Sequence, residues 1–155
     1  MELRSLIQDY LREAKMMQLA TVANNRPWVC NVWFAADDDL NIYWFSSKTR
    51  RHSHEVEANP HVAAAICLPH TPADRFARAL QIEGTAERLK NPLDVAKATK
   101  CYVGRIFDLA QVNNFINNLE KPHRFYRLTP ETIVLFDTKN FPNDSRQVLS
   151  LTKPH

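Results

Sequence analysis

Residues 43–66 read YWFSSKTRRHSHEVEANPHVAAAI, and this stretch decides the order of the elements around it. The aromatic run that ends at Phe45 is typical of a buried strand, and the small apolar residues after the Asn-Pro pair are typical of another. Between the two runs the sequence predicts a helix over residues 46–58, entered through a serine cap. Asn59-Pro60 is expected to end this helix, because the residue before a proline disfavours the helical conformation.

The sequence on the N-terminal side of this stretch predicts one helix and an antiparallel meander. Residues 2–14 carry apolar side chains at helical spacing, which indicates an amphipathic helix packed on the rest of the domain. Apolar runs at 16–23, 28–35 and 40–46 follow, and the turn-forming clusters NNRP and DDD separate them. Strands joined by turns this short must be antiparallel, because parallel neighbours need a crossover of about a dozen residues or more.

The sequence on the C-terminal side of residues 43–66 predicts further strands and two helices. Asn91-Pro92 indicates a helix start, a cap followed by a proline at the first helical position. The expected elements are strands at 62–68 and 80–89, helices at 92–102 and 111–119, and a hairpin of strands 123–128 and 132–137 turned at Thr129-Pro130-Glu131. The remaining residues show no clear period. The fold class predicted from these patterns is mainly β with peripheral helices.

Composition and charge exclude several classes of protein. Gly84 and Gly104 are the only glycines, whereas a phosphate-binding loop or a dinucleotide fingerprint needs two or three within a few residues. The net charge of +3 does not indicate the uniformly basic surface of a non-specific nucleic-acid binder. Because the three cysteines form no C-x-x-C pair and His52 and His54 do not share a helix face, we predict no disulfide framework and no metal site. The charged N-terminus and the short apolar runs favour a cytoplasmic protein without a membrane span.

Two of the predicted strands have apolar side chains on both faces. In WVCNVWFA, residues 28–35, both alternating sets contain a tryptophan, so neither set is suited to contact with water. LNIYWF at 40–45 repeats the pattern. One face of the sheet is therefore expected to line the core, and the other to meet a ligand or a partner chain.

Positive charge gathers at the start of the predicted helix. Lys48, Arg50 and Arg51 follow the two serines and are joined by His52. The N-terminus of a helix carries the positive end of its dipole, so cations there are unfavourable unless an anion shares the site. Backbone N–H groups, serine hydroxyls and a guanidinium together suit a phosphate dianion. The junction predicts a phosphate site, and a solvated basic patch is the alternative.

The stretch at 43–66, together with LQIEGTAERL at 80–89, resembles the FMN-binding split-barrel family related to pyridoxamine 5'-phosphate oxidase. The resemblance covers residues 16–137 and implies an antiparallel split β-barrel. It implies a single FMN-binding domain over residues 1–155, with an N-terminal helix at 1–14, barrel and inserted helices at 16–137 and a tail at 138–155. It further implies a homodimer with the cofactor at the interface, acting as an oxidoreductase on a small-molecule substrate.

Carried over by position, the resemblance assigns roles in cofactor binding but no catalytic residue. Ser46 and Ser47 lie beside the phosphate, Arg51 pairs with it, and His52 occupies a place often held by a lysine. The implied border of the ring system is Phe45 and the backbone of Val29, Cys30, Asn31 and Val32. Cys30 and Ala35 stand near the places where pyridoxamine phosphate oxidases proper carry an arginine and a lysine, so the resemblance is to the broad family.

Two other functions remain open from the sequence. The same pocket suits a non-catalytic module that binds haem or a deazaflavin, because members of the broad family bind FMN, deazaflavin or haem. A small barrel that binds single-stranded nucleic acid through basic and aromatic groups is the other reading. The mild net charge and the single basic junction argue against it, so we expect no nucleic-acid partner.

Overall fold

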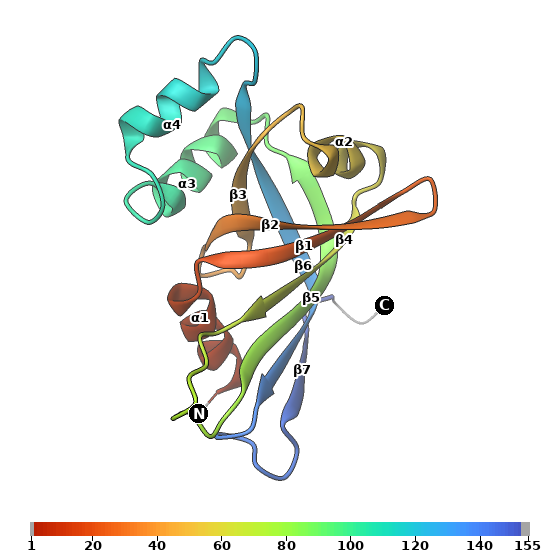
Figure 1. The fold of residues 1–155 in the computed structure, drawn as a ribbon, viewed down its shortest axis with the longest axis vertical. Coiled ribbons are helices and arrows are strands. Elements are labelled where there is room, and N and C mark those ends of the chain that lie inside the picture. The colour runs from red at the N-terminus through yellow and green to blue at the C-terminus, as the bar shows by residue number, and fades with distance from the viewer. Residues whose placement is uncertain (1, 153–155) are drawn as a thin grey trace.

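One antiparallel sheet organises the structure, a computed structural model that describes residues 2–152 (Figure 1). Its strands are β1 (Met16–Ala23), β2 (Arg26–Ala36), β3 (Ile42–Ser47), β4 (His61–Cys67), β5 (Arg78–Arg88), β6 (His123–Asp137) and β7 (Arg146–Ser150). They lie in the order β3-β2-β1-β4-β5-β6-β7, and β3 also pairs with β6, which closes the sheet on itself. The helices are α1 (Leu3–Glu13), α2 (Arg51–Ala58), α3 (Pro92–Tyr102) and α4 (Leu109–Ile116). The predicted fold class, mainly antiparallel β with peripheral helices, is confirmed.

The hairpin of β1 and β2 turns at the predicted cluster. Asn24 and Asn25 form a two-residue connection, and both have positive φ, at 52° and 57°. Turns of this kind match the twist of the flanking strands, and asparagine tolerates the left-handed conformation that they need. Figure 1 shows the tip of this hairpin standing out from the sheet beside α2.

The predicted hairpin at residues 123–137 is wrong, because β6 is one continuous strand. Its first half pairs with β3 and its second half with β7, while β5 runs alongside nearly the whole strand. Pro130 lies opposite Gly84, where the register between β5 and β6 shifts. A strand accommodates a proline at such an irregularity, since the lost N–H is not needed for a regular ladder. Thr129-Pro130-Glu131 therefore marks a bulge and not a turn.

The segment predicted as a tail, residues 138–155, contains strand β7. β7 pairs with β6 from Thr132 to Phe136 and alternates between exposed and half-buried side chains. Five residues are too few for that alternation to be recognised in the sequence. Residues 153–155 lie outside the described part of the chain.

Two apolar clusters hold the fold together. The larger fills the barrel beneath α1, and the smaller lies between β3, β6 and the pair α3 and α4. α3 begins as predicted, with the Asn91 side chain accepting a hydrogen bond from the Leu93 N–H. α4 begins at Leu109 and ends at Ile116, earlier than the predicted 111–119, because Asp108 and Gln111 form a capping box. No helix among residues 2–152 is long and apolar enough to cross a membrane.

Candidate functional site

The junction between β3 and α2 differs from the predicted serine-capped helix. Ser46 and Ser47 are the last residues of β3, where they pair in register with Arg124 and His123 of β6. This ladder holds both serines extended, so the helix begins only at Arg51. The N-cap residue is Arg50, whose side chain makes no capping hydrogen bond. The predicted serine cap over 46–58 is therefore wrong, and Lys48 and Arg50 precede the first turn of α2.

The structure brings Ser46 and His52 together inside the protein. His52 Nε2 lies 3.0 Å from Ser46 Oγ, and both side chains are buried. Burial, and then the positive charge of Arg50, hold the pKa of His52 below its ordinary value. The buried imidazole and the buried hydroxyl together brace the junction from within.

Ser47 braces the loop that follows β3. Its Oγ accepts a hydrogen bond from the Thr49 N–H at 3.2 Å and lies 2.9 Å from Thr49 Oγ1. Ser53 Oγ, in the first turn of α2, donates to the Ser47 carbonyl oxygen at 2.8 Å. The hydroxyls of Ser46 and Ser47 thus both form hydrogen bonds within the protein. In the loop that follows, Thr49 is exposed.

Arg51 is held in a defined position at the start of α2. Its Nε donates to Glu55 Oε2 at 3.1 Å, and its Cζ lies 4.3 Å from the centre of the Trp28 ring. Its side chain is 48% exposed, whereas that of Glu55 is 8% exposed. Among residues 2–152, neither Nη group of Arg51 donates a hydrogen bond. The guanidinium therefore has one edge and one face occupied, and its two Nη groups are available.

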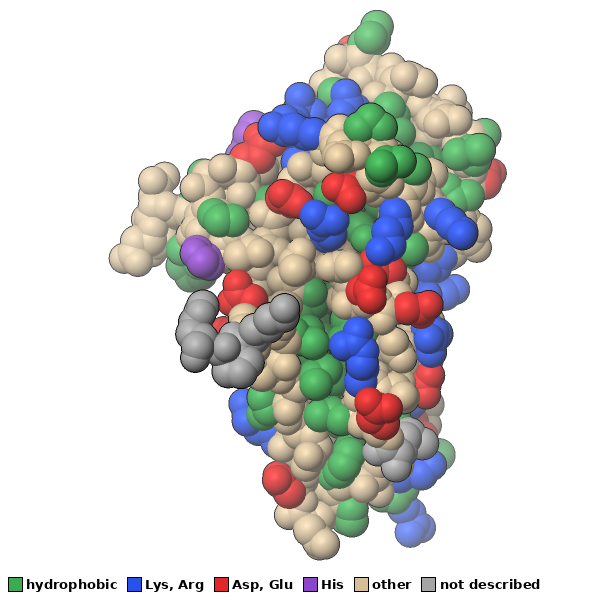
Figure 2. Space-filling view, turned by 180° about the vertical axis from the view of Figure 1, so that it is seen from behind, with side chains coloured by type: hydrophobic (Ala, Val, Ile, Leu, Met, Phe, Trp, Pro, Cys, Tyr) green, Lys and Arg blue, Asp and Glu red, His purple; other side chains and the backbone are tan. Residues whose placement is uncertain are grey.

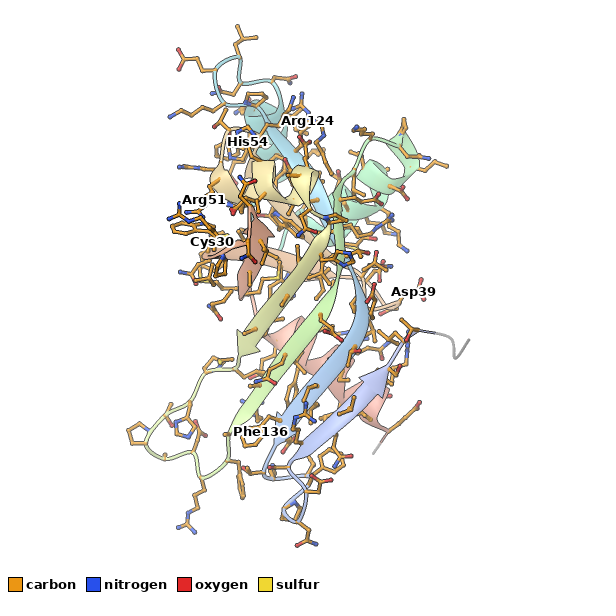
Figure 3. All side chains as sticks on the ribbon, turned by 90° about the vertical axis from the view of Figure 1, so that its right-hand side faces the viewer. Cys30, Asp39, Arg51, His54, Arg124 and Phe136 are labelled. Carbon is orange, nitrogen blue, oxygen red and sulfur yellow. The ribbon has the colours of Figure 1, made fainter. Side chains whose placement is uncertain are left out.

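Arg51 borders a hollow of about 490 Å³ between α2 and the tip of the β1–β2 hairpin. The lining residues are Ala23, Asn24, Arg26, Thr49, Arg51, His54 and Glu55. Figure 3 shows Arg51 and His54 on the same side of the molecule as Cys30. Two arginines, an imidazole and a hydroxyl around one hollow suit a phosphate or another small anion.

Glu55 is the one acidic group among the residues lining this hollow. Thr21 Oγ1 donates to its Oε2 at 3.4 Å, in addition to the bond from Arg51. Burial, and then the negative charge of Glu55, raise the pKa of the nearby Cys30 thiol to about 11. A carboxylate this buried requires partners, and Arg51 supplies the charged one.

The side chains of the residues expected to border a ring system lie in three regions. Val29 is 58% exposed and lies on the outer face of the hairpin. On the same face, Asn31 accepts a hydrogen bond from Gln18 Nε2 at 3.0 Å. Val32 is buried in the barrel core, and half-buried Cys30 packs against it. Phe45 lies in the smaller cluster, with its ring 4.6 Å from that of Phe125. Because the expected border was Phe45 and the backbone of residues 29–32, these side-chain positions do not test it, and it stays a prediction.

The sequence missed four residues of the hollow: Arg26, Thr49, His54 and Glu55. Arg26 stands in a turn cluster, and nothing local indicates that this turn lies against α2. In the sequence His54 stands out only as half of a histidine pair with His52. Among the described residues, no three His, Cys, Asp or Glu side chains come close enough to hold a metal ion. The spacing of Arg51 and Glu55, four apart in a predicted helix, was the available signal for their ion pair.

Two features of the surface relate to the expected homodimer and to the expected lack of a nucleic-acid partner. Exposed apolar side chains of the β1–β2 hairpin include Met16, Val22, Val29 and Trp33. On the face shown in Figure 2, Lys and Arg side chains are interspersed with Asp and Glu side chains and do not form a uniformly basic surface.

Comparison with known proteins gives a family match over most of the chain. The family model described as pyridoxamine 5'-phosphate oxidase matches residues 3–137. The UPF0306 protein plu4501 of Photorhabdus laumondii is 27% identical over 100 residues, which cover 62% of this chain and 68% of that protein.

Solved structures share the fold at low sequence identity. A haem-binding protein from Mycobacterium smegmatis has a TM-score of 0.78 at 14% identity, covering 97% of this chain. The chain spans only 58% of the length of that protein. An FAD-binding protein from Mesorhizobium loti has a TM-score of 0.63 at 17% identity, covering 86% of this chain and 92% of that one. These similarities show a common split-barrel fold.

Proposed function

The chain belongs to the pyridoxamine 5'-phosphate oxidase family, which matches residues 3–137, and from this premise we propose that it is an FMN-binding oxidoreductase acting on a small molecule. The observation that carries the proposal is Arg51, whose two free Nη groups border a hollow large enough for a phosphate group. A planar guanidinium with a free pair of donors binds phosphate oxygens in a bidentate manner.

The residues of this chain fit the phosphate end of FMN. Arg51 offers the donor pair, Arg26 adds a second cation, and Thr49 adds a hydroxyl at the same hollow. Ser46, Ser47 and His52 contribute by fixing the loop and the first turn of α2. FMN, when bound, supplies the electron chemistry, and the protein supplies binding and orientation.

The ring end of the cofactor requires a second protein surface, and we propose a homodimer that provides it. Val29 and Trp33 expose apolar area on the strand that would border the ring, at 58% and 45% of their surface. Closed two-fold dimers are the commonest way to cover such a face. FMN would then lie at the interface, with its phosphate held by one protomer.

We expect the protein to be a dimer at low micromolar concentration. Light scattering should return about twice the chain mass of 17.9 kDa. Trp33→Ser, which replaces an exposed ring without touching the barrel interior, should shift the mass toward that of one chain. A stable monomer that still binds FMN would contradict the shared site.

FMN titration followed by flavin fluorescence is the direct test of the proposal. We expect quenching at micromolar FMN and much weaker binding of riboflavin, because riboflavin lacks the phosphate that Arg51 binds. Charge-assisted hydrogen bonds contribute about 1.5–3 kcal/mol each, so their loss should weaken binding at least tenfold. Absence of quenching removes the flavin assignment, and equal affinity for the two ligands removes the phosphate role of the hollow.

Haem is the second candidate, favoured by His54 at the hollow and by the fold shared with a haem-binding protein. An exposed imidazole is a common iron ligand. In that case the protein is a binding module, as it would be with a deazaflavin. A visible absorption spectrum after incubation with each cofactor separates flavin from haem, and a barrel that binds nucleic acid would give neither band.

A further inference from the structure

Two groups on different elements fix the guanidinium of Arg51. Glu55, one turn further along α2, accepts from Nε at 3.1 Å. Trp28 of β2 lies beneath the guanidinium, with 4.3 Å from Cζ to the ring centre. One contact holds an edge of the planar group and the other holds a face. Rotation about the side-chain bonds of Arg51 would break at least one of them.

The fixed edge determines which donors remain. With Nε engaged by Glu55, the two Nη groups are the donors that remain. Neither Nη donates to any residue in the range 2–152, and the side chain is 48% exposed beside the hollow. An arginine whose fork is already oriented loses less conformational freedom when it binds an anion.

We propose that Glu55 is a positioning residue for a phosphate group, acting through Arg51, with Trp28 as its second support. This inference rests on the phosphate assignment of the proposed function but not on the flavin. Glu55 itself carries a negative charge at an anion site, so its direct electrostatic effect opposes binding. Its contribution to binding is therefore the orientation of Arg51, and the two effects have opposite signs.

The opposite signs make two substitutions at one position diagnostic. Glu55→Ala removes both the charge and the acceptor for Nε, whereas Glu55→Gln removes the charge and keeps an acceptor. We expect Glu55→Ala to weaken the binding of inorganic phosphate about tenfold, as for one lost charge-assisted bond. We expect Glu55→Gln to bind phosphate as well as the unsubstituted protein, or up to about threefold more tightly. Titration calorimetry with inorganic phosphate measures both.

Glu57→Gln is the matched control. Glu57 lies on the same helix and pairs with Arg88 on the side away from the hollow, so phosphate affinity should stay within twofold. Trp28→Leu is a second variant for the case in which Glu55→Ala does not fold. Trp28 is exposed, so its replacement should leave the fold intact. It should weaken phosphate binding about threefold by removing the support of the guanidinium face.

A measurement without any ligand tests the positioning directly. In ¹⁵N-labelled protein the Nε–H of Arg51, assigned with Arg51→Lys, should exchange slowly with water. The exchange should remain slow in Glu55→Gln and become fast in Glu55→Ala.

Tighter or unchanged phosphate binding in Glu55→Ala overturns the inference, because Glu55 would then only offset positive charge. Equal weakening in the alanine and glutamine variants also overturns it, as does a protein that binds no phosphate at millimolar concentration. Phosphate binding with the expected pattern but no FMN binding would remove the flavin and leave the role of Glu55 standing.

Discussion

Gly84→Ala should destabilise the protein by about 3 kcal/mol, because it adds one methyl group where two strands already touch. Gly84 is buried in β5 at the point where the register with β6 shifts. A Cβ there would overlap the Thr129 carbonyl oxygen and lie 2.9 Å from Pro130 Cα. Both neighbours are backbone atoms of β6, which pairs with β5 on either side of this position, so they have little freedom to move. Urea unfolding followed by circular dichroism measures the loss.

Gly104→Ala is the control for this substitution. Gly104 has φ of +82°, but a Cβ there meets no atom within 4 Å. Only the strain of a left-handed conformation opposes the alanine, which costs about 1–2 kcal/mol. If both variants lose the same stability, the close approach of β5 and β6 at Gly84 does not limit the fold.

Arg51→Ala should weaken FMN binding by about ten- to a hundredfold, far more than Arg50→Ala or Lys48→Ala. All three changes remove one positive charge from the same short segment. Arg51 alone is oriented by Glu55 and Trp28 beside the hollow. Arg50, which is exposed, and Lys48, which is half-buried, precede the helix, and charges accessible to water contribute less than about 1 kcal/mol.

The measurement is FMN affinity for each variant at two salt concentrations, with melting temperatures recorded. Arg51→Ala leaves the buried Glu55 without its cation, so a lower melting temperature is expected as well. Arg51→Lys, which keeps the charge but not the fork, should recover little of the affinity. Near-equal, strongly salt-dependent losses across the three alanine variants would mean that long-range charge alone holds the phosphate.

Local sequence patterns were sufficient to predict those elements whose structure depends on their own residues alone. The Asn24-Asn25 turn and the helix entered at Asn91-Pro92 carry their signals within a few residues, and both are where the sequence places them. Ser46-Ser47 and Thr129-Pro130-Glu131 misled because cap and turn residues also occur in strands when a neighbouring strand supplies the pairing. In both cases that neighbour is distant in sequence.

The same limit applies to the candidate site. Arg51 and the serines were identified from one continuous stretch and from the family resemblance. Arg26 and Trp28 reach Arg51 only because the β1–β2 hairpin extends beside α2, a contact between elements that no period in either one encodes. The ion pair of Arg51 with Glu55 follows from helical spacing, but the burial of Glu55 does not.

The position of strand β6 late in the chain determines when the barrel can close during synthesis. β3 is complete at Ser47, whereas its second partner begins only at His123. During translation, the edge of β3 that pairs with β6 stays unpaired until α2, β4, β5, α3 and α4 have been synthesised. Every residue of β3 is buried in the finished fold, so the nascent chain carries an unpaired, otherwise buried strand edge while residues 48–122, about half of the chain, are synthesised. Closure of the barrel is necessarily a late event in biosynthesis.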